Sequence, residues 1–88
     1  MRVITENDIA RACVVLGRLR DAGAWSMTDE IDRKKAIAAG ALMRVCAVPR
    51  DDIEYHLKNN ARQLAALGSR VLGVFETTVL EHQHGPLS

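Results

Sequence analysis

The sequence predicts an all-α fold of three helices, of which the C-terminal helix is the longest, and two observations carry this prediction. Apolar residues recur at helical spacing in three stretches, which Gly23 and Pro49 separate. The composition is 48% hydrophobic but only 3% aromatic, so Ala, Leu, Ile and Val must form the core. This composition favours closely packed helices over a β-sandwich. We expect residues 1–88 to form a single helical domain.

The first helix is expected over residues 6–22. Thr5 and Asp8 have the spacing of a helix N-cap pair, and acidic side chains suit the positively polarised first turn. Gly23 supplies a stop signal. The predicted buried stripe consists of Ile9, Ala12, Cys13 and Leu16.

The second helix is expected over residues 27–47. Ser26 or Thr28 would cap it, and acidic residues follow in its first turn. Gly40 lies opposite the apolar stripe and weakens the helix. The predicted stripe consists of Met27, Ile31, Ala38, Leu42 and Val45.

The third helix is expected over residues 50–82, with a loose tail over 83–88. Pro49 suits a helix start and disfavours helical backbone at the residue before it. Two alternatives stay open. The helix could end at Gly68 or Gly73, or residues 74–80 could form a short strand that pairs with residues 2–5.

A continuous third helix would be about 50 Å long, and residues 1–48 can hardly cover its apolar stripe. A second copy of the chain is the simplest cover, so the sequence predicts a homodimer. Gly68 on the stripe would let two backbones approach closely. The predicted dimer interface consists of Leu64, Gly68, Val71, Leu72, Phe75 and Val79.

Composition and motifs argue against several classes of function. The net charge is +1, no run of about 18 apolar residues is present, and the N-terminus has no signal-peptide core, so we expect a cytoplasmic protein. Phosphate loops and nucleophile motifs are lacking, so we expect no enzyme and no cofactor. His82 and His84 lack the spacing of a zinc site, so no metal is expected. Cys13 and Cys46 are interpreted as core residues, with a disulfide or redox pair as the alternative.

Two helix faces carry candidate partner-binding residues. On the outer face of the third helix, an exposed tyrosine beside arginine has the composition of protein-contact hot spots. On the outer face of the first helix, two valines lie among polar residues, where either a partner or another helix would cover them. The candidates are Tyr55, Asn59 and Arg62 on the third helix, and Arg11, Val14, Val15 and Arg18 on the first.

Residues 48–64 also carry a DNA-binding pattern. The segment resembles the recognition helix of LuxR-type helix-turn-helix domains, in which β-branched residues precede a His-Leu-like pair. The matching residues are Val48, Ile53, His56, Leu57 and Leu64. The resemblance implies a transcriptional regulator that reads DNA with residues 50–62. Asp51, Asp52 and Glu54 would then face phosphate charge.

The favoured prediction is a small non-enzymatic protein that docks on a protein partner as a regulator, adaptor or inhibitor. Bacterial, phage and plasmid accessory proteins, including inhibitors of host defence complexes, fit this description. The DNA-binding regulator is the alternative. No membrane association is expected.

Overall fold

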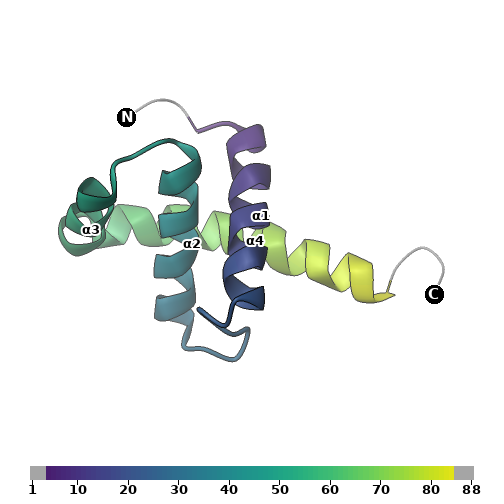
Figure 1. The fold of residues 1–88 in the computed structure, drawn as a ribbon. Helices are drawn as coiled ribbons and strands as arrows, with labels where there is room; N and C mark the ends of the chain where they lie inside the picture. The colour runs from purple at the N-terminus through teal and green to yellow at the C-terminus, as the bar shows by residue number, and fades with distance from the viewer. Residues whose placement is uncertain (1–3, 85–88) are drawn as a thin grey trace.

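The computed structural model describes residues 4–84, with side chains described as far as residue 79. Helices are the only regular secondary structure in these described residues, which confirms the predicted all-α class. The elements are α1 (Glu6–Asp21), α2 (Ile31–Val45), α3 (Arg50–Asn59) and α4 (Ala61–His84) (Figure 1). There are thus four helices in the described residues, where the sequence predicted three. None of these helices combines the length and apolarity that crossing a bilayer requires.

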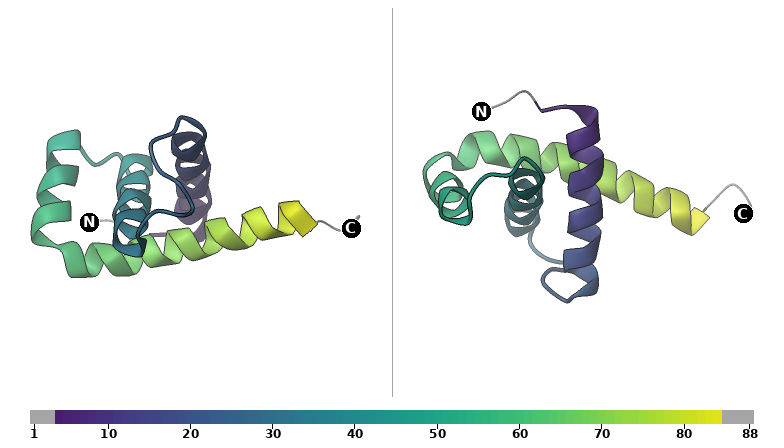
Figure 2. Two further views of the ribbon diagram at one scale, coloured as in Figure 1. Left: turned by 90° about the horizontal axis from the view of Figure 1, so that it is seen from below. Right: turned by 45° about the horizontal axis from the view of Figure 1, so that its top comes forward.

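Helices α1 and α2 run side by side in opposite directions and form a hairpin, and α4 lies crosswise against both of them (Figures 1 and 2). Helix α3 stands at the N-terminal end of α4. It contacts α2 and α4, and within the described residues it makes no contact with α1. The hairpin and α4 therefore form the main core, and α3 projects from one end of it.

Helix α1 begins as the sequence predicts. The Asp8 backbone N–H donates to Thr5 Oγ1 at 3.2 Å, and the Thr5 backbone N–H donates to Asp8 Oδ2 at 2.9 Å. This reciprocal capping box satisfies two donors that a helix start leaves unpaired. The helix ends at Asp21, and Gly23 follows in the left-handed region with φ of 81°. The predicted stop is therefore confirmed.

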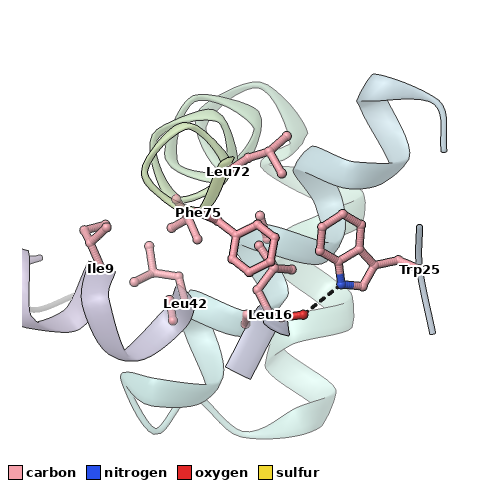
Figure 3. Close-up of a cluster of buried hydrophobic side chains, with 10 residues drawn as sticks. Ile9, Leu16, Trp25, Leu42, Leu72 and Phe75 are labelled. Atoms are coloured by element: carbon pink, nitrogen blue, oxygen red, sulfur yellow. Dashed lines mark hydrogen bonds between the residues drawn. The ribbon is translucent and has the colours of Figure 1, made fainter. Parts of the chain in front are cut away.

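Helix α2 begins at Ile31, later than the predicted residue 27. The Ser26 backbone N–H donates to Asp29 Oδ2 at 2.8 Å, so these side chains form a turn and do not cap α2. Trp25 anchors the connection, because its indole Nε1 donates to the Leu16 carbonyl at 2.9 Å in the core (Figure 3). Ile31 is exposed as a result, although it was predicted to be buried.

The predicted helix over residues 50–82 is wrong, because the chain breaks at Asn60. This residue has φ of −124° and ψ of 34°, and its side-chain Nδ2 lies 2.8 Å from Nδ1 of His56 in a hydrogen bond. Asparagine favours such breaks because its amide competes for hydrogen bonds with the helical backbone. Beyond the break, α4 continues through Gly68 and Gly73, and residues 74–80 are helical. The strand alternative and both glycine ends are therefore also wrong, while residues 85–88 of the predicted tail lie outside the described residues.

The apolar stripe of α4 is covered by its own chain, so the prediction that residues 1–48 cannot cover it is wrong. The stripe from Leu64 to Val79 is about 22 Å long, and two helices lying across it cover about 20 Å. The expectation of an obligatory dimer loses its basis, and the oligomeric state stays a prediction. Of the predicted dimer-interface residues, Val79 is half-buried against the core and five are buried in it: Leu64, Gly68, Val71, Leu72 and Phe75.

Phe75 is central to the larger of the two buried clusters (Figure 3). Its ring meets that of Trp25 edge to face, with centroids 5.6 Å apart, and the guanidinium of Arg20 lies 5.1 Å from the ring centroid. These contacts join α4, α1 and the α1–α2 connection. At the other end, a second cluster of Ala39, Met43 and Leu64 joins α2 to α4.

The closest approach of two helices occurs at Gly68. A Cβ atom at this position would collide with the Lys35 carbonyl oxygen and lie 2.8 Å from its carbonyl carbon. Contacts this short do not occur between real Cβ atoms and backbone, so only glycine permits α4 to rest against the backbone of α2 here. The nearby ion pair between Lys34 Nζ and Glu76 Oε1, at 3.8 Å, joins the same two helices.

We predict that Gly68→Ala destabilises the fold by about 2 kcal/mol or more, because the added methyl group forces α2 and α4 apart. Gly73→Ala is the matched control. Its new Cβ meets nothing within 4 Å, so higher helix propensity should stabilise the chain by up to about 1 kcal/mol. Urea unfolding followed by circular dichroism measures both. Equal stabilities of the two variants would contradict the close crossing.

Candidate functional site

The outer face of α3 presents the predicted tyrosine. Tyr55 is 61% exposed, and its ring lies edge-on to that of His56 with centroids 5.6 Å apart. Asn59 is also exposed, and its Nδ2 donates to the Tyr55 carbonyl at 2.8 Å. Helix α3 has no fully buried residue. The structure therefore brings Tyr55 and Asn59 together on an accessible surface.

Arg62 lies beyond the break at Asn60 and belongs to α4. It is exposed, and with Lys35, Asp32 and Leu57 it borders a pocket of about 450 Å³ between α2 and the α3–α4 corner. The prediction placed Arg62 on one continuous helix with Tyr55. The two residues instead lie on different helices that share the Asn60 corner.

The predicted residues of α1 lie on a separate surface. Arg11, Val14 and Arg18 are exposed, with Val14 at 56%. Val15 is half-buried and packs against the core, so it belongs partly to the interior. Because α1 does not contact α3 in the described residues, the structure does not unite the two predicted surfaces (Figure 1).

Sequence reasoning missed a groove that runs along α2 between α3 and the end of α1. It is an open groove with a volume of about 760 Å³. Small residues of α2 form its floor, and apolar side chains from α3, the α2–α3 turn and the end of α1 contribute to its walls. The available signal was Ala36 and Gly40, four residues apart on the helix face opposite the stripe, with arginines beyond them. The lining residues are Leu19, Ala24, Arg33, Ala36, Ile37, Gly40, Ala41, Arg44, Val48, Arg50, Ile53, Glu54 and Leu57.

Positive charge predominates around this groove. Arg33 is engaged by its own chain, because its Nε lies 3.4 Å from Asp29 Oδ2 and its Nη2 donates to the Ala24 carbonyl at 3.3 Å. Within the described part of the chain, Arg44 and Arg50 form no ion pair, and both are exposed. Glu54 is the acidic residue of the lining. The groove thus combines apolar side chains with available positive charge near the α2–α3 turn.

The two cysteines are free thiols in the structure. Burial raises the pKa of the Cys13 thiol, and its Sγ lies 3.6 Å from the Val71 carbonyl, to which it donates. A neutral thiol is a weak nucleophile, which favours a structural role for Cys13 over a redox role.

The described residues contain no cluster of three or more His, Cys, Asp or Glu side chains that could hold a metal ion. His82 and His84 are the histidines whose spacing argues against a zinc site. Their side chains lie outside the described residues.

No known protein family, curated protein or solved structure matches the chain. The functional argument therefore depends on the geometry and chemistry of these surfaces.

We predict that Cys13 reacts more slowly with iodoacetamide in the folded chain than in urea, because burial disfavours its thiolate. In the Cys46→Ser variant, Cys13 is the one remaining thiol. Its alkylation is carried out at about pH 8 and followed by mass spectrometry. Since the pKa is raised on folding, Cys13 contributes stability that is lost as the pH rises past the ordinary thiol range. A folded rate that equals the unfolded rate would contradict this placement.

Proposed function

We propose that this chain is a non-enzymatic interaction protein that docks on a protein partner as a regulator, adaptor or inhibitor. The observation that carries the proposal is the 61% exposure of Tyr55 on α3, a helix that buries none of its residues completely. Tyrosine combines a large apolar ring with a polar hydroxyl, and it is enriched where proteins contact one another.

The packing of α3 leaves its outer face available. Ile53 and Leu57, together with Val48 of the preceding turn, pack against the smaller buried cluster and hold the helix in place. The opposite face carries Tyr55 and Asn59, and the Asn59 side chain is held before any partner arrives by its hydrogen bond to the Tyr55 backbone carbonyl. Side chains that are already ordered lose less conformational entropy on binding. This arrangement supports a preformed contact surface.

The turn before α3 favours a second candidate, a helix-turn-helix DNA-binding protein. Helices α2 and α3 are joined by the short turn 46–49, in which Ala47 has φ of 61°, and α3 crosses the direction of α2 (Figure 2). The turn of a helix-turn-helix motif often contains glycine, and Ala47 has the positive φ that glycine adopts readily. Electrostatics oppose this candidate, because the three exposed acidic residues Asp51, Asp52 and Glu54 outnumber the one Arg and one Lys of α3.

We predict that Tyr55→Ala and Arg62→Glu each reduce partner capture from the native host by about tenfold or more. Both side chains are exposed, so circular dichroism should show intact folding. Thr77→Ala is the control, because Thr77 is exposed on α4 and its hydroxyl donates to the Gly73 carbonyl of the same helix at 2.9 Å. Unchanged capture by both α3–α4 variants would contradict the proposed surface.

For the second candidate, we predict that the chain shows no measurable affinity for mixed-sequence duplex DNA at low salt, because α3 has excess negative charge. A salt-titrated mobility shift measures this affinity. Binding whose logarithm falls steeply with the logarithm of salt concentration, and which Lys58→Glu weakens, would support the DNA-binding candidate in place of protein docking.

A further inference from the structure

We propose that the groove between α2 and α3 binds an amphipathic helix of a partner protein, and that the end of this helix nearest the α2–α3 turn is acidic. The site shares α3 with the Tyr55 surface but uses the opposite face, so the inference goes beyond the proposed function. Shape, apolar lining and charge each specify one property of the occupant.

The floor of the groove sets the shape. Ala36 and Gly40 lie one helical turn apart on α2, and a Cβ atom at Gly40 would meet nothing within 4 Å. Small residues let a second helix approach to the short end of the usual 8–10 Å spacing. The lining runs from Arg33 to Arg44, about 16 Å of α2, which matches about three turns of a docked helix.

The walls require apolar side chains in the occupant. Ile37, Val48 and Leu57 are only half-buried, and they face the groove from α2, the turn and α3. Covering them removes apolar surface from water, which favours binding. A helix with an apolar stripe can fill this space, because successive stripe residues recur on one face every three or four positions.

The edge of the groove specifies the charge of the occupant. Arg44 and Arg50 flank the α2–α3 turn, and neither forms an ion pair with another described residue. Arg33 at the other end is held by Asp29, so the available positive charge is concentrated near the turn. Guanidinium groups bind carboxylates through paired hydrogen bonds. The acidic residues of the occupant should therefore lie near Arg44 and Arg50.

A peptide probe tests the site directly. The probe is a synthetic helical peptide of about 18 residues, with a Leu/Ala face, Glu residues in the turns at one end and a fluorescent label. A matched peptide carries Lys in place of each Glu. Fluorescence anisotropy should show that the Glu peptide binds about tenfold more tightly than the Lys peptide.

Variants of the chain locate the binding. Gly40→Leu places a side chain on the groove floor and should weaken binding of the Glu peptide by about tenfold or more. Gly73→Leu is the matched control, because its Cβ is equally unobstructed but lies on α4, outside the groove lining, so binding should not change. The double variant Arg44→Glu with Arg50→Glu should reverse the preference in favour of the Lys peptide.

Three outcomes would overturn this inference. They are equal binding of the two peptides, undiminished binding to Gly40→Leu, and self-association of the chain that Gly40→Leu abolishes, which would assign the groove to a second copy. If the Glu peptide does not bind but Tyr55→Ala still reduces partner capture, only the proposed role of the groove is refuted. Intact peptide binding without Tyr55-dependent capture would refute only the proposed function of the outer face.

Discussion

The contact between Gly68 of α4 and the backbone of Lys35 in α2 is the constraint on which the rest of the structure depends. Because position 68 has no side chain, the two helices cross with their backbones in contact, and neighbouring side chains interdigitate on both sides of the crossing. Leu64 packs towards α3 on one side, and Val71 and Phe75 pack under α1 on the other. A crosswise helix can thus be covered by two short helices, which explains how a chain of 88 residues hides a long apolar stripe within itself.

Local chemistry was predictable from the sequence, and relative placement was not. The capping box at Thr5, the stop at Gly23 and the start after Pro49 each depend on residues close in the chain, and the structure confirms them. The apolar pattern does not indicate the break at Asn60, because Ile53, Leu57 and Leu64 keep one helical period across it. Periodicity shows which face of a helix is apolar, but it does not show which other helix packs across that face. The sequence therefore predicts a second copy of the chain as the cover of the stripe.

The same distinction applies to the candidate site. Exposure of Tyr55 followed from its position opposite the stripe, and the structure confirms that exposure. The groove required knowledge of where α3 stands relative to α2, which the Asn60 corner determines. Helix α3 consequently has two different faces: a tyrosine surface turned away from the molecule and an apolar wall turned towards α2. This division allows one short helix to contribute to two separate contacts.

Isotope-filtered NMR on a mixture of labelled and unlabelled chains tests most directly whether the chain covers its own stripe. The account predicts nuclear Overhauser effects between the rings of Phe75 and Trp25, whose centroids lie 5.6 Å apart, within a single chain. It also predicts that the filtered experiment shows no such effects between labelled and unlabelled chains. Phe75–Trp25 effects observed only between different chains would contradict it, because the stripe would then be covered by a second copy.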